Sequence, residues 1–112
     1  MEWNTYDNGA SIGQRGSEDG VILYDDEHSL GARITLEQGG GIAPFSITCG
    51  IYGWTFHTRF FGSQQESETD YEHMKNSLTD ILNIIQHETD AEGSQKMAQI
   101  SDAISKFVDR YP

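Results

Sequence analysis

Hydrophobic and polar residues alternate in short segments over the first half of the chain. Ile34 and Leu36 share one face of such a segment, and Arg33, Thr35 and Glu37 share the other. A period of two residues is typical of a half-buried strand. The same pattern predicts strands at 2–6, 11–15, 21–27, 32–38, 44–50 and 53–61.

Turn-forming residues separate these segments. Asn8-Gly9 and Asp19-Gly20 are hairpin signals, and residues 39–41 form a glycine loop. The stretch 50–53 fits either a tight turn between two strands or a glycine-marked bulge. Because the connections are short and contain no helical segment, they favour an antiparallel meander over alternating strands and helices.

From Ser63 onwards the hydrophobic period is that of a helix. Ser63 and Glu66 have the spacing of a capping box. A hydrophobic stripe follows at Tyr71, Met74, Leu78, Ile81, Leu82 and Ile85. After a break near Gly93, a second stripe lies at Met97, Ile100, Ile104, Phe107, Val108 and Tyr111. Two amphipathic helices are therefore expected, and each needs an apolar surface to cover.

Together these patterns predict a single α+β domain. Its first part, 1–62, is an antiparallel meander of five to six strands, and its second part, 63–112, is two helices packed on one sheet face. We expect Trp54 and Phe56 beneath the helices and Phe61 facing away from them. The opposite face is then solvated, covers a ligand or meets a second subunit. It is expected to carry Arg33, Thr35, Glu37, Ser46, Thr48, Thr55, His57 and Arg59.

Composition adds a strong negative charge to this picture. The chain of 112 residues has a formal net charge of −11, spread over both halves. Such a field disfavours nucleic acid and anionic membranes as partners and speeds encounter with a basic protein. The alternative is that the charge serves only solubility. The longest apolar run has four residues, Val21 to Tyr24, no secretory signal is visible, and Cys49 is the only cysteine, so a cytoplasmic location is expected.

The sequence carries no recognisable metal or cofactor motif. The four histidines, at 28, 57, 73 and 87, lack the spacing of metal ligands on a helix. The acidic run 25–28 alternates between the two faces of a strand, so it offers two ligands per side at most. We expect no metal, no cofactor and no catalytic residue.

A thiol–imidazole pair of Cys49 and His57 is the one nucleophilic arrangement to consider. The alternation places Cys49 on the apolar face with Phe45, and His57 on the polar face with Thr55. A lone cysteine is most often a small buried hydrophobe. The pattern therefore argues against a catalytic thiol.

One group of candidate binding residues remains on the polar face. Arg33, His57 and Arg59 are predicted there together, and arginine binds carboxylate or phosphate well. The alternative is ordinary cross-strand ion pairing, for example of Arg33 with Glu37. Near them, Tyr52 and a surplus aromatic residue suit a ligand or dimer surface.

The function expected first is therefore a non-enzymatic protein-interaction module. An acidic helix surface that runs from Glu66 to Glu72, with Glu68 and Glu72 as binding residues, would meet a basic partner. Small inhibitor and immunity proteins are similar to this description in size and charge. The alternative is a small-molecule or anion-binding domain, with or without catalysis, that uses Arg33, His57 and Arg59. A further expectation is a homodimer formed through the open sheet face.

Overall fold

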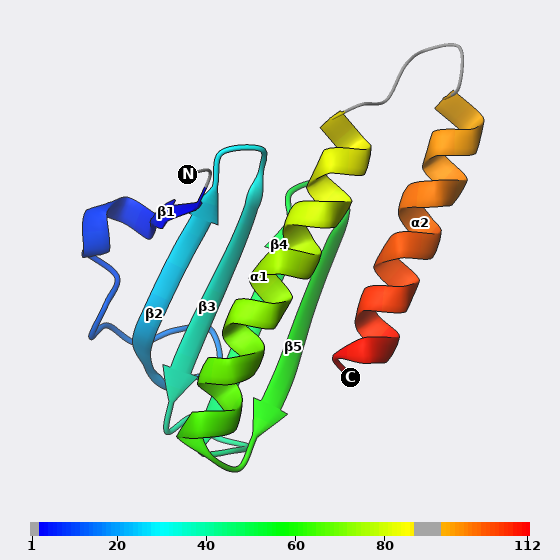
Figure 1. The fold of residues 1–112 in the computed structure, drawn as a ribbon. Helices are drawn as coiled ribbons and strands as arrows, with labels where there is room; N and C mark the ends of the chain where they lie inside the picture. The colour runs from blue at the N-terminus through cyan, green and yellow to red at the C-terminus, as the bar shows by residue number, and fades with distance from the viewer. Residues whose placement is uncertain (1–2, 87–92) are drawn as a thin grey trace.

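The computed structural model describes residues 3–86 and 93–112 of the chain. Five strands and two long helices make up these residues, in the order drawn in Figure 1. The strands and helices are β1 (Trp3–Thr5), β2 (Val21–His28), β3 (Ala32–Gln38), β4 (Phe45–Ile51), β5 (Thr55–Phe61), α1 (Gln64–Gln86) and α2 (Gly93–Arg110), with a short 3-10 helix η1 (Tyr6–Gly9) after β1.

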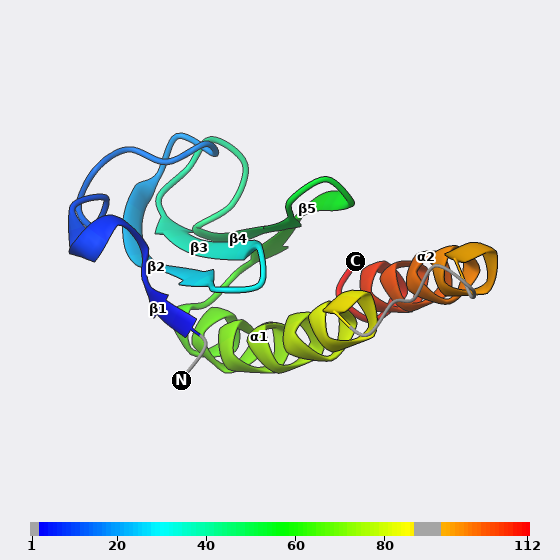
Figure 2. The same ribbon diagram turned by 90° about the horizontal axis from the view of Figure 1, so that it is seen from above.

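The strands form one antiparallel sheet in which spatial order follows chain order, β1-β2-β3-β4-β5. The predicted meander is therefore confirmed. The strand expected at 11–15 is wrong, because only an isolated bridge between Arg15 and Val21 forms there. That part of the chain arches over the face of the sheet opposite α1 instead, as Figure 2 shows.

Both helices pack on one face of the sheet, which confirms the predicted layers. Ser63 caps α1, since its hydroxyl accepts the backbone N–H of Glu66 at 3.3 Å. α1 contacts β3, β4 and β5, and α2 lies beside α1 towards the β5 edge (Figures 1 and 2). Among the described residues, no helix is long and apolar enough to cross a membrane.

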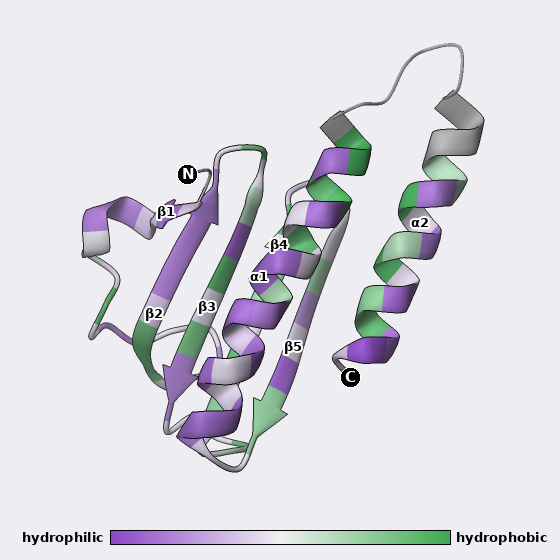
Figure 3. Cartoon of the chain, viewed as in Figure 1, coloured by the Kyte–Doolittle hydropathy of each residue, from purple (hydrophilic) through white to green (hydrophobic). Residues whose placement is uncertain are grey.

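The core lies between the sheet and α1. Ile34, Leu36 and Ile47 are fully buried against Met74 and Leu78. Both predicted helix stripes are largely buried, and Figure 3 shows hydrophobic bands interrupted by hydrophilic ones along each helix. The exception is Met97, which is 50% exposed near the start of α2.

The sequence analysis assigns the residues of β5 to the wrong faces of the sheet. The register pairs Cys49 with His57 and Ile47 with Arg59, so both polar residues lie on the helix face. Cross-strand partners share a face, and the turn before β5 therefore decides which of its residues point inward. As a result Phe61 is buried and Phe56 is exposed, the reverse of the expectation.

The connection between β4 and β5 is a tight turn, the first of the two alternatives for residues 50–53. The backbone N–H of Trp54 donates to the carbonyl of Ile51 at 2.9 Å. Gly53 has a φ of +82°, which the third residue of such a turn requires and which glycine adopts without strain. Tyr52 is thereby held at the tip of the hairpin.

Candidate functional site

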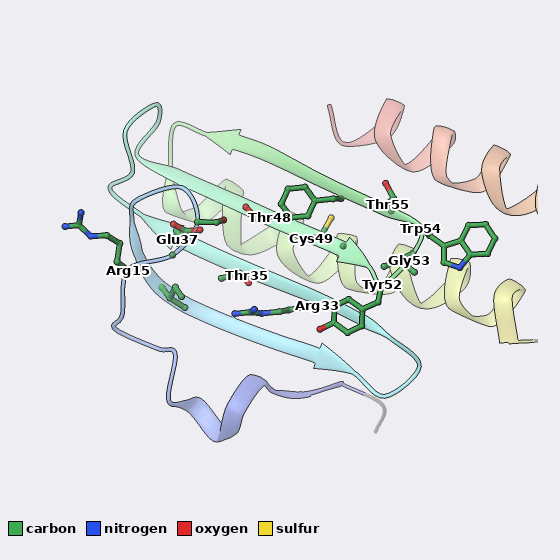
Figure 4. Close-up of a pocket in the computed structure, with 16 residues that line it drawn as sticks. Arg15, Arg33, Thr35, Glu37, Thr48, Cys49, Tyr52, Gly53, Trp54 and Thr55 are labelled. Atoms are coloured by element: carbon green, nitrogen blue, oxygen red, sulfur yellow. The ribbon is translucent and has the colours of Figure 1, made fainter.

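A cleft of about 730 Å³ opens on the sheet face opposite the helices. The arching segment between β1 and β2 forms one wall, and β3, β4 and the β4–β5 hairpin form the floor and the other end (Figure 4). Its lining side chains are mixed in polarity: Arg15, Ser17, Ile22, Arg33, Thr35, Glu37, Thr48, Cys49, Ile51, Tyr52, Trp54, Thr55 and Phe56. A cleft of this size with apolar walls and a few polar groups is the usual form of a binding site.

Three exposed aromatic residues lie along this side of the hairpin, and we call them the aromatic strip: Tyr52, Phe56 and Phe60. Their exposed fractions are 54%, 75% and 40%. Phe56 and Phe60 point to the open face because their cross-strand partners are Gly50 and Ser46, on the face that also carries Glu37. Exposed apolar patches often mark an interaction surface, whereas single exposed apolar residues occur on any surface.

Arg33 lies in the cleft beside Tyr52 (Figure 4). Its Nε and Nη2 donate to the two carboxylate oxygens of Asp25 at 2.9 and 2.7 Å, and its guanidinium stacks on the ring of Tyr6 at 3.6 Å. The hydrogen bonds to Asp25 raise the pKa of Arg33. The predicted open-face position of Arg33 is confirmed, but its ion-pair partner is Asp25 rather than Glu37.

Asp25 itself is buried, and four donors satisfy it. Besides Arg33, the hydroxyls of Ser11 and Thr35 donate to it at 2.7 and 3.0 Å. A buried carboxylate needs such compensation. The pair therefore fixes the arching segment, through Ser11, and the guanidinium in the cleft.

Glu37 fastens a different part of the arching segment. Its carboxylate accepts the backbone N–H groups of Glu18 and Gly20, each at 3.1 Å, and the residue is 1% exposed. Gly16 passes so close that a Cβ there would lie 2.3 Å from the carboxyl carbon of Glu37. Glu37 therefore holds the cleft wall in place.

Tyr52 is oriented by a second carboxylate. Its hydroxyl donates to Glu27 at 2.7 Å. Partial burial and this hydrogen bond raise the pKa of Tyr52 to about 12, so the phenol stays neutral at physiological pH. Among the predicted binding residues, the structure thus brings Arg33, Glu37 and Tyr52 into one cleft.

His57 and Arg59 lie on the other face, so the expectation that they join Arg33 is wrong. His57 donates from Nε2 to the backbone carbonyl of Tyr111, and its ring packs on Phe107. Arg59 forms an ion pair with Asp70 of α1, with Nε and Oδ2 3.2 Å apart. Both side chains join the helices to the sheet.

Glu68 and Glu72 lie on α1, on the far side of the sheet from the cleft. Glu68 accepts the hydroxyl of Tyr24 at 2.8 Å and the side-chain amide of Gln64 at 3.2 Å. The bond to Glu68 raises the pKa of Tyr24. Glu72 is exposed.

Cys49 and His57 are cross-strand partners, which corrects the prediction that they lie on opposite faces. The thiol is nevertheless buried, with 2% exposed, and burial raises its pKa to about 12. A reactive cysteine needs a lowered pKa and an accessible sulfur. The pair therefore lacks the properties of a nucleophile and its base.

Comparisons with protein-family models, with curated proteins and with solved structures give no match. Within residues 3–86 and 93–112, no group of three His, Cys, Asp or Glu side chains could hold a metal ion. His87, one of the four histidines considered above, lies outside the described residues. The site must therefore be interpreted from its own side chains.

Sequence reasoning missed several residues that line the cleft, among them Arg15 and Phe56. Residues 1–62 contain only three basic residues, and two of them, Arg15 and Arg33, line the cleft. The scarcity of basic residues indicates that two of them share a site, but the sequence analysis pairs Arg33 with Arg59, whereas the structure pairs it with Arg15. Phe56 was missed because apolar alternation alone assigns an aromatic residue to the core.

Proposed function

We propose that this domain is a protein-interaction module without catalytic activity, and that its partner binds on the open face of the sheet. The observation that supports this proposal is the aromatic strip beside the cleft. Phe56, with 75% of its surface exposed, adds little stability to the isolated domain by burial. Binding of a partner would remove that surface from water.

The shape of the surface favours a protein segment over a compact small molecule. Phe56 and Phe60 are four residues apart on one strand, about 13 Å along the sheet. Tyr52, at the tip of the hairpin, and Phe56 both line the cleft of about 730 Å³. An extended segment could cover the strip and place one or two side chains in the cleft. Aromatic residues and arginine are also the types that dominate the energetics of protein interfaces.

The acidic surface of α1 is a second location for the same function. Glu66 and Glu72 are exposed there, and the whole chain carries −11. Glu68, in contrast, already accepts two hydrogen bonds, and Asp70 is paired with Arg59. Because charge alone adds little affinity without apolar anchors, the open face is the stronger candidate.

The proposal is tested by replacing Phe56 with serine and capturing partners from an extract of the native cell at low salt. Wild-type domain and the Ile42→Ser variant should retain the same protein in equal amounts. Ile42 is 78% exposed and does not line the cleft, so it controls for loss of an exposed apolar residue. Phe56→Ser should reduce retention about tenfold or more, the loss expected for an apolar anchor.

A neutral apolar dye, N-phenyl-1-naphthylamine, gives a second measurement that needs no partner. Its fluorescence should rise with saturable binding to the wild type and to Ile42→Ser, and much less with Phe56→Ser. Equal behaviour of Phe56→Ser and wild type in both assays would exclude the open face as the binding surface. Loss of retention with Glu72→Lys alone would move the site to α1.

A further inference from the structure

We infer that the segment bound on the open face is basic, and that one of its lysine or arginine side chains lies on the ring of Tyr52 beside the carboxylate of Glu27. The inference rests on the proposed function and adds the chemistry of the partner to it.

The first argument is the charge of the cleft. Its two arginines are already matched by acids, Arg33 by Asp25 at 2.7 Å and Arg15 by Asp19 at 3.0 Å. Glu37 in the lining and Glu27 on Tyr52 add two further carboxylates. These six groups carry two positive and four negative charges, so a cation is favoured over an anion at this face.

The second argument is the geometry at Tyr52. Its ring is 54% exposed at the tip of the hairpin, and its hydroxyl donates to Glu27 at 2.7 Å. A cation over an aromatic ring gains from the negative face of the π-system. A hydrogen bond from the phenol to a carboxylate adds electron density to that ring and places a negative charge within reach of the same cation.

Arg33 is near Tyr52 and could be expected to repel a cation. Two of its nitrogens, however, are held by one buried carboxylate, and its guanidinium is stacked on Tyr6 at 3.6 Å. The negative charge of Asp25 thereby offsets the positive charge of the Arg33 guanidinium. Arg33 lines the cleft, and the N–H groups that it does not use for Asp25 suit the backbone carbonyls of an extended segment.

The test uses two blocked, fluorescently labelled seven-residue peptides that alternate leucine with lysine or with glutamate. Binding to the full chain is measured by anisotropy at low salt. The lysine peptide should bind about tenfold more tightly than the glutamate peptide. Raising the salt from about 0.02 M to about 0.5 M should remove most of that preference.

Three single substitutions locate the effect. Glu27→Gln keeps an acceptor for Tyr52 but removes the charge, and it should weaken binding of the lysine peptide about fivefold. Tyr52→Leu should do the same by removing the ring. Glu72→Gln removes one exposed charge from α1 and should leave binding unchanged.

The outcomes separate this inference from the proposed function. If both peptides bind equally, and Phe56→Ser still abolishes binding, the open face is an interaction surface but the basic partner is wrong. If Glu72→Gln rather than Glu27→Gln weakens the lysine peptide, the basic segment binds on α1 and the inference is wrong. If neither peptide nor the neutral dye binds the wild type, the proposed function fails as well.

Discussion

The guanidinium of Arg33 holds the carboxylate of Asp25 through two hydrogen bonds, of 2.9 and 2.7 Å, and the side chain of Asp25 is fully shielded from solvent. The arginine, in contrast, remains about one-third exposed in the cleft. One ion pair thus joins the interior of the sheet to the candidate binding surface. Its loss should affect stability first and binding second.

Replacing Arg33 with methionine should lower the free energy of unfolding by about 2–4 kcal/mol, because it leaves a buried carboxylate without its counter-charge. Urea denaturation measures the change. Arg15→Met is the matched control. The pair of Arg15 with Asp19 has both side chains exposed, so its loss should change stability by less than about 1 kcal/mol.

Equal effects of the two substitutions would contradict a special role for the pair of Arg33 and Asp25. The double variant Asp25→Asn with Arg33→Met offers a further check. Since it removes both charges, it should recover part of the stability lost in Arg33→Met.

A glycine-to-alanine comparison tests the anchoring of the cleft wall. Alanine at position 16 would place its Cβ 2.3 Å from the carboxyl carbon of Glu37. Because Glu37 is buried and accepts the N–H groups of Glu18 and Gly20, it cannot move aside without losing them. We expect Gly16→Ala to cost about 1–3 kcal/mol in urea denaturation.

Gly41→Ala serves as the control for that comparison. A Cβ at position 41 meets no atom within 4 Å. The substitution should be neutral or stabilise the domain slightly, by reducing the freedom of the unfolded chain. A neutral Gly16→Ala would show that the wall is not held against Glu37.

Alkaline pH should destabilise the domain through Cys49. Burial raises the pKa of the thiol from 9.0 to about 12 in the folded protein, so the unfolded chain loses this proton first as the pH rises. Stability from this group is complete below pH 9 and is lost between about pH 9 and pH 12. At pH 10.5 the loss should be about 2 kcal/mol relative to pH 8.

Urea denaturation of wild type and Cys49→Ala at the two pH values measures this effect. The alanine variant should be less stable at pH 8, because it leaves a small cavity, but its stability should fall less with pH. Tyr71 shares the direction of the shift, since burial raises its pKa strongly, and it remains in both proteins. Identical pH dependence of the two proteins would exclude Cys49 as a contributor.

Most of the fold could be predicted from local patterns. The strand β3 was predicted with its observed bounds, Ala32–Gln38, and the cap at Ser63 forms as its spacing indicated. These features depend on neighbours in the sequence: alternation on one strand, or a hydroxyl three residues from a backbone N–H. Because interactions between residues close in the sequence determine these features, the sequence alone was sufficient to predict them.

The candidate site could be predicted only in part, because it depends on which face each strand presents. The alternation of β5 is equally consistent with aromatic residues inward or outward. Pairing with β4 selects the second arrangement and places Arg59 and His57, both half-buried, on the helix side of the sheet. There Arg59 pairs with Asp70 of α1, and His57 donates to the carbonyl of Tyr111, just after α2. Those partners are contributed by residues up to 54 positions away, and no local pattern contains them.

Chain-order pairing of the strands has a consequence for how fast the domain forms. Pairing of β2 with β3, of β3 with β4 and of β4 with β5 closes only short loops, so the entropy lost before each of these hairpins forms is small, and such local pairing favours rapid folding. Among the side-chain hydrogen bonds of the described residues, the one with the largest sequence separation joins the two ends of this architecture: the indole N–H of Trp3 in β1 donates to Thr79 of α1 across 76 positions. Because its contacts span the longest stretches of chain, we expect the edge strand β1 to join the sheet last, after strands β2 to β5 have paired and α1 has packed on them.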